Sequence, residues 1–269
     1  MNDTGAYSYL RSHPLTTERI ADMQARLQLN GPAKSSPGDM VQAMLGARAK
    51  VLSQNSVEAL RAWTLDSKAT SAQATLAQKA GALYAATLAH LQLRDGPAAE
   101  SPLQSLLPLA AQNPEAHRLA TLLQAELAIW QERFASALQT LEAASSQPFK
   151  RPELMAAAQA LLRLPPRPER AAITLQLREW LTQAPNDAQA WNTLASMLNL
   201  QGQALPSLRA EGEAQMARMD WPGAVDRFRA AQDWARNNRL QAGDHIEASI
   251  VDTRLRQAQA QIRAIQTER

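Results

Sequence analysis

Residues 184–202 read APNDAQAWNTLASMLNLQG, and this stretch decides the fold class. Its Pro-Asn-Asp segment ends one helix and starts the next, because these side chains favour turns and accept hydrogen bonds from free backbone N–H groups. Trp191, Leu194 and Leu198 then recur at spacings of three and four residues, which is typical of one face of an α-helix. Gly202 follows near the expected turn. The stretch therefore predicts one amphipathic helix between two turns.

Similar breaks recur through the central part of the chain. They fall at 95–97, 113–114, 147–148 and 164–168, and amphipathic segments of 10 to 16 residues separate them. Pro114, Pro148 and Pro185 lie 34 and 37 residues apart. A period near 35 residues is typical of a helical solenoid.

Composition agrees with a helical fold. The 269 residues include 53 Ala but only 5 Val and 7 Ile, which argues against a β-rich or doubly wound α/β fold. The net charge of +3 comes from interspersed acids and bases and makes a weak case for nucleic acid binding. Cysteine is absent, so disulfides and thiolate chemistry are excluded. No apolar run approaches the ~20 residues of a membrane helix, and residues 1–7 do not resemble a signal peptide.

The period matches a known repeat. The pattern of bulky and small residues over 115–231 resembles the tetratricopeptide repeat, and 72–114 resembles it more loosely. Small residues are expected between paired helices, because axes about 8–10 Å apart leave no room for larger side chains. The residues assigned to these contacts are Ala125, Ala137, Leu141, Ala144, Ala195, Ala224, Phe228 and Ala231. An alanine-rich helical bundle is the alternative.

The last segment is predicted to be a capping helix. Asp244 is the expected N-cap, with Glu247 completing a capping box. Ile246, Ile250, Leu255, Ala258, Ile262 and Ile265 form the expected apolar stripe, and Arg254, Arg256 and Arg263 the solvated face. An earlier segment shows helical periodicity at Met40, Met44, Ala47, Val51 and Leu52, and a second helix is expected to continue it with Leu60, Trp63 and Leu65. The predicted fold is therefore all-α, a tetratricopeptide-like helical solenoid with a C-terminal capping helix.

No catalytic motif is present in the sequence. The four histidines, His13, His90, His117 and His245, form no H-E-x-x-H pair, and neither a glycine-rich phosphate loop nor a G-x-S-x-G elbow occurs. We therefore expect this chain not to be an enzyme, and expect no cofactor or metal in it.

One N-terminal stretch carries a more specific resemblance. Residues 9–22, with His13-Pro14 and Arg19-Ile20, resemble the end of the catalytic domain of HtpX-like zinc metallopeptidases. Residues 44–49, 80–84 and 248–255 resemble one branch of that family, the beta-barrel assembly-enhancing protease and its relatives.

That resemblance implies a domain organisation and a cellular role. Residues 1–30 would be the remnant of a metallopeptidase domain, 31–39 a linker, and 40–269 the tetratricopeptide domain with its capping helix. The complete protein would be a periplasmic zinc endopeptidase, associated with membranes only indirectly, whose repeats recruit outer-membrane barrel assembly machinery or unfolded outer-membrane proteins. His13 would lie near its zinc as an auxiliary ligand and Arg19 would brace the loop. The alternative is a free tetratricopeptide scaffold or chaperone adaptor.

We expect a protein-interaction function, with partners held in the concave groove of the repeats. The positions predicted to face this groove are Gln189, Asn192, Ser196 and Asn199, with Arg118 and Glu126 as weaker candidates. Their polar side chains suit backbone or carboxylate partners, although they would equally serve to solvate the helix face.

Overall fold

The computed structural model describes residues 39–54, 56–69, 73–144, 148–240 and 243–267, and the single positions 21 and 25, with side chains omitted at 67–69. These residues form twelve α-helices and no strand, which confirms the all-α prediction. The helices are α2 (Met40–Ser53), α3 (Val57–Ala69), α4 (Leu76–Gln92), α5 (Gly96–Ala110), α6 (Pro114–Trp130), α7 (Phe134–Ala144), α8 (Arg151–Arg163), α9 (Glu169–Gln183), α10 (Ala188–Leu200), α11 (Ala204–Ala217), α12 (Trp221–Asn237) and α13 (Asp244–Thr267). Apart from positions 21 and 25, the described residues do not include the predicted remnant at 1–30, which contains His13 and Arg19. They also do not include residues 31–38 of the predicted linker.

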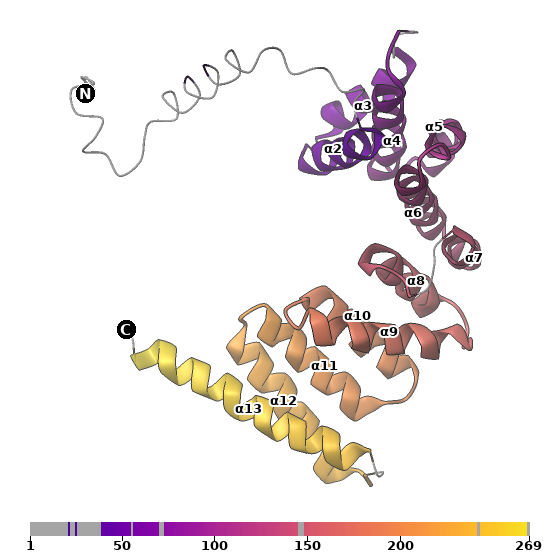
Figure 1. Cartoon of the computed structure of the whole chain (residues 1–269). Helices are drawn as coiled ribbons and strands as arrows, with labels where there is room; N and C mark the ends of the chain where they lie inside the picture. Colours follow the sequence, from indigo (N-terminus) through magenta and orange to yellow (C-terminus); the bar gives the residue numbers. More distant parts are fainter. Residues whose placement is uncertain are drawn as a thin grey trace, which may run out of the picture.

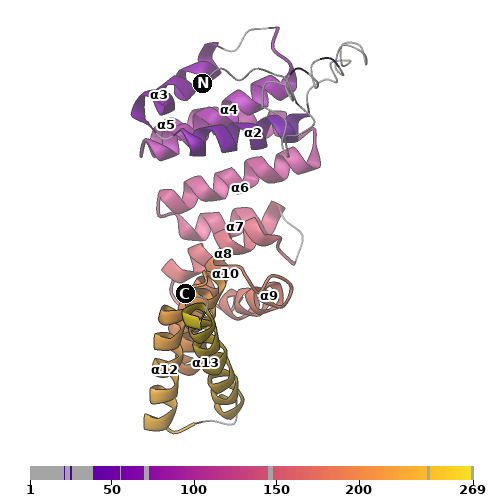
Figure 2. The same cartoon turned by 90° about the vertical axis from the view of Figure 1, so that its left-hand side faces the viewer.

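The helices are stacked along a curved column, with α2–α4 at one end and α12–α13 at the other (Figure 1, Figure 2). From α4 to α13 each helix packs against the next one in the chain. The even-numbered helices also contact one another in series, α2 with α4, α4 with α6, α6 with α8, and α8 with α10. These five helices therefore form a continuous layer along the first two thirds of the column.

The predicted breaks coincide with observed helix boundaries. Asn113 caps α6 by accepting hydrogen bonds from two backbone N–H groups, and Pro114 occupies the first helical position, where its missing N–H costs nothing. Asp187 caps α10 by accepting a hydrogen bond from the backbone N–H of Ala190. Asp95 caps α5 in the same way, and Pro148 and the segment 164–168 lie between consecutive helices.

A second kind of turn occurs after four helices, and the sequence had indicated a glycine turn only at Gly202. After α4, α6, α10 and α11, one residue adopts a positive φ of 62°, 59°, 72° and 60°, at Arg94, Glu132, Gly202 and Met219 respectively. In each case its N–H bonds to the carbonyl three residues back, and the next N–H bonds to the carbonyl five residues back. This is the Schellman ending, which satisfies carbonyls that a helix end leaves free. Glycine adopts a positive φ without strain, whereas other residues adopt it at some cost and do not mark it in the sequence. Of the four positions, only Gly202 could therefore be recognised as a turn from the sequence.

The core is divided into three clusters that follow the column. One spans α2–α6, the next α6–α10 together with Ala210 of α11, and the third α11–α13. The predicted contacts Ala125, Ala137, Leu141, Ala195, Ala224, Phe228 and Ala231 are all buried. Ala144 is exposed, because α7 ends at that residue and no other described segment covers it.

The C-terminal helix differs from its prediction in several details. Asp244, which was predicted to cap the helix, is its first residue, and the carboxylate of Glu247 pairs with Arg209 of α11. Arg254 is not merely solvated, since it pairs with Glu213, a carboxylate buried on α11. Val251, Leu255 and Ala258 are buried, whereas Ile246 and Ile265 are exposed. None of the described helices has both the length and the apolar character needed to span a membrane.

Candidate functional site

The layer of even-numbered helices carries a long groove, which we call the inner groove. Its lining comes from α2, α4, α6, α8 and α10 and from Arg94 in the turn after α4, and its volume is about 1070 Å³. The helix contacts α2–α4, α4–α6, α6–α8 and α8–α10 bring these faces together. Five segments spread over more than 140 residues of sequence, from Leu45 to Thr193, therefore share one surface.

Bulky apolar side chains are left open along this groove. Leu45 and Leu52 of α2 are 48% and 49% exposed, and Trp130 at the end of α6 is 41% exposed. Met155 and Leu162 of α8, both half-buried, continue the apolar lining. Leu52, one of the apolar positions in the helical pattern of this segment, lines the groove. Large apolar side chains left exposed along one groove are typical of an interaction site.

A three-residue polar cluster crosses the groove. Arg48 of α2 donates two hydrogen bonds to the carboxylate of Glu126 on α6, at 2.9 and 3.0 Å, and a third to the hydroxyl of Tyr84 on α4, at 3.1 Å. Burial opposes the charge on Arg48, but its hydrogen bonds and charge interactions with Glu126 and Tyr84 together outweigh that cost and raise its pKa. Burial also raises the pKa of Tyr84, although the Arg48 cation works against this shift. The cluster ties the first, second and third inner helices together.

A second polar cluster lies at the other end. Arg151 of α8 donates to Asp187 at 2.6 and 3.0 Å and to the Gln189 side-chain carbonyl at 3.1 Å. Trp180 of α9 donates to the same carboxylate at 2.9 Å. The bonds from Arg151 lower the pKa of Asp187 to about 2, with burial acting in the opposite direction.

The six predicted site residues are not gathered in one place. Glu126 and Gln189 line the inner groove, where Glu126 is held by Arg48 and Gln189 by Arg151. Asn192, Ser196 and Asn199 lie on α10 but not among the lining residues, and the Ser196 hydroxyl donates to the Asn192 carbonyl.

Arg118 has a structural partner instead. Its Nε atom lies 2.7 Å from one oxygen of the buried Glu153, and its Nη2 donates a hydrogen bond to the other oxygen at 3.4 Å. Arg118 also pairs with Glu115 at 3.0 Å. The interface between α6 and α8 is therefore where Arg118 acts in this structure.

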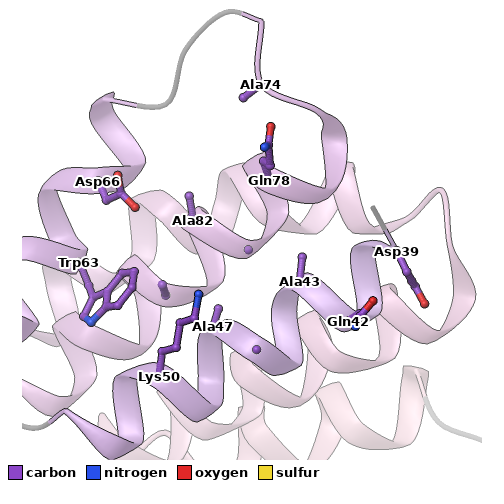
Figure 3. Close-up of a pocket in the computed structure, with 13 residues that line it drawn as sticks. Asp39, Gln42, Ala43, Ala47, Lys50, Trp63, Asp66, Ala74, Gln78 and Ala82 are labelled. Carbon is purple, nitrogen blue, oxygen red and sulfur yellow. The ribbon is translucent and has the colours of Figure 1, made fainter. Parts of the chain in front are cut away.

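A second hollow lies between α2, α3 and α4 (Figure 3). It has a volume of about 760 Å³ and is lined mainly by small residues, with Lys50 and Trp63 near one end and Asp39 and Gln42 along its edge (Figure 3). The small residues reflect close helix packing, since a Cβ on Gly81 would lie 3.2 Å from the backbone oxygen of Ala43. This hollow lacks the row of exposed leucines that marks the inner groove.

No group of three or more histidine, aspartate or glutamate side chains able to hold a metal ion occurs within the described ranges. Comparison with known proteins gives no assignment: no protein-family model matches the sequence, and no curated protein is detectably similar to it.

Proposed function

We propose that this chain is a tetratricopeptide-like helical solenoid that binds segments of other proteins in its inner groove. The observation that carries the proposal is the convergence of exposed Leu45, Leu52 and Trp130 on one concave surface built from five consecutive inner helices. The repeated Schellman turns and the serial contacts of α2, α4, α6, α8 and α10 support the repeat architecture.

The lining favours a polypeptide over a small metabolite. Pockets for small molecules usually have volumes of ~300–1000 Å³ and enclose most of the ligand. The inner groove has a volume of about 1070 Å³, at the upper end of this range, but its lining extends over five helices. Tryptophan and arginine surrounded by aliphatic side chains are also the residues that dominate protein interfaces. An extended or helical segment with two or three apolar side chains would cover Leu45, Leu52 and Trp130.

A selection experiment tests the proposal. The purified chain is used to select binders from a random 16-residue peptide phage library, and synthetic copies of the enriched peptides are titrated by fluorescence anisotropy. Leu52→Glu should weaken their binding at least ~10-fold, because a buried charge would replace an apolar contact. Leu175→Glu is the matched control, since Leu175 on α9 is 57% exposed and lies outside the groove. Equal affinity of the two variants would refute the assignment of the groove.

A second proposal rests on the N-terminal resemblance. We propose that the module belongs to a periplasmic zinc metallopeptidase of the HtpX-like family and recruits outer-membrane proteins or their assembly machinery to it. The His13-Pro14 stretch and Arg19-Ile20 support this, and both lie outside the described residues. The genomic reading frame upstream of the Met1 codon tests it. An H-E-x-x-H helix in that frame is expected, whereas a start codon with ribosome-binding signals would favour the free scaffold.

A further inference from the structure

We infer that the inner groove selects segments that carry a carboxylate beside their apolar side chains. This inference rests on the proposed function, because it concerns the occupant of the same groove. The evidence is the balance of charges and of hydrogen-bonding groups among the lining residues. Arg48, Arg94 and Arg151 supply three cations, and Glu126 is the single carboxylate among the described residues that line the groove.

The carboxylate of the groove is already engaged. Both oxygens of Glu126 accept hydrogen bonds from Arg48, at 2.9 and 3.0 Å. The side-chain oxygen of Gln189 likewise accepts from Arg151. A guanidinium has five N–H donors and no acceptor, so Arg48 and Arg151 keep unused donors even in these pairs. The groove therefore offers donors in excess, and a complementary segment must bring acceptors.

Arg94 marks the part of the groove where an acidic side chain of the bound segment would lie. Arg48 is compensated by Glu126 and Arg151 by Asp187, whereas the exposed side chain of Arg94 makes no hydrogen bond or ion pair within the described part of the chain. Its turn leads directly into α5, where a Cβ on Gly96 would overlap the indole of Trp130. The free guanidinium thus lies in a turn that packs against an exposed apolar anchor. A segment with an acidic residue next to an aromatic or aliphatic one would meet both groups at once.

The same lining argues for a peptide rather than a nucleic acid. Leucine, isoleucine and methionine make up nine of the 21 residues that line the groove and arginine only three, whereas nucleic acid sites place many basic side chains along a phosphate track. One uncompensated arginine provides orientation and selectivity, while the apolar side chains provide hydrophobic contacts.

Charge reversal at Arg94 tests this inference with the selected 16-residue peptides. Peptides enriched by the wild-type chain should be rich in Asp or Glu adjacent to Leu, Phe or Trp. Arg94→Glu should weaken their binding by ~10-fold, and a second selection with this variant should enrich Lys or Arg at the same positions. Arg61→Glu, an equal charge change at an exposed residue outside the groove, should alter the affinity by less than ~2-fold.

The outcomes separate this inference from the proposed function. If Leu52→Glu abolishes binding but the peptides show no acidic enrichment and Arg94→Glu has no effect, the inference is wrong and the groove assignment stands. If acidic peptides bind and Leu52→Glu leaves them bound, both are wrong. A dimer seen by light scattering that Leu52→Glu dissociates would identify a second copy of the chain as the occupant and would also overturn the inference. Equal affinity for a single-stranded oligonucleotide would do the same.

Discussion

Replacing Asp187 with asparagine should destabilise the junction of α8, α9 and α10 by about 1–2 kcal/mol at neutral pH. The wild-type carboxylate accepts hydrogen bonds from Arg151, Trp180 and the backbone N–H of Ala190. An asparagine keeps the helix cap, because its side-chain oxygen still accepts from the backbone. It loses the charge that pairs with Arg151 and one of the two acceptor oxygens.

The magnitude follows from the pKa of Asp187, which lies at about 2 in the folded chain. Relative to an ordinary aspartate near ~3.9, the difference corresponds at face value to about 2.5 kcal/mol of stabilisation. The Arg151 side chain is 38% exposed, and solvent screening of the pair reduces this to about 1–2 kcal/mol. Because the folded pKa is lowered, the stabilisation is fully present above about pH 4 and is lost as the pH falls toward 2.

Urea unfolding followed by circular dichroism at pH 7, 5, 3 and 2 measures this effect. The difference in unfolding free energy between wild type and Asp187→Asn should be largest at pH 5–7 and should shrink toward zero at pH 2. Asp220→Asn is the matched control, because Asp220 also caps a helix but accepts only from the Gly223 backbone among the described residues. Equal losses in the two variants, or a loss at Asp187 that persists unchanged at pH 2, would refute the role assigned to this carboxylate.

Three further changes have expected effects on stability that the same unfolding assay measures. Met219→Gly should stabilise the chain by ~1 kcal/mol, because the φ of 60° at Met219 is strained for a residue that has a Cβ atom. A loss of stability would contradict this. Gly212→Ala should destabilise it by ~2 kcal/mol or more, since the added Cβ would overlap the buried ring of Phe228, and a neutral result would mean that the ring moves freely. Arg254→Ala should cost ~2–3 kcal/mol by leaving Glu213 buried without its main partner. Adding Glu213→Gln should recover part of that loss, and strict additivity of the two changes would argue against the pair.

The helix boundaries that polar caps mark were predictable from sequence. The sequence itself marks the boundaries at Asn113-Pro114 and at Asp187, because the side chains that end one helix also accept hydrogen bonds from the N–H groups of the next. The Schellman turns at Glu132 and Met219 were not, because their conformation depends on helix packing and no glycine marks them. Similarly, the exposure of Ala144 depends on where α7 ends.

The groove was only partly predictable, for a related reason. Helical periodicity assigns Leu52 to an apolar face but cannot tell whether another helix covers that face. The pairing of Arg48 with Glu126 joins residues 78 apart, and no local pattern announces such a contact. Polar positions on α10 were selected from one repeat alone, whereas the groove is a property of five helices. Leu45 and Trp130 would have been found by asking which apolar residues of the predicted helices are not needed to fill the core.

A site-specific probe tests the central claim, that the inner groove is where partner segments bind. Because the chain contains no cysteine, Leu52→Cys and Leu175→Cys each create a unique attachment point for an environment-sensitive dye such as bimane. Saturation with a selected peptide should shift the emission of the dye at position 52 and leave the dye at position 175 unchanged. An unchanged signal at 52, or equal shifts at both positions, would contradict the account.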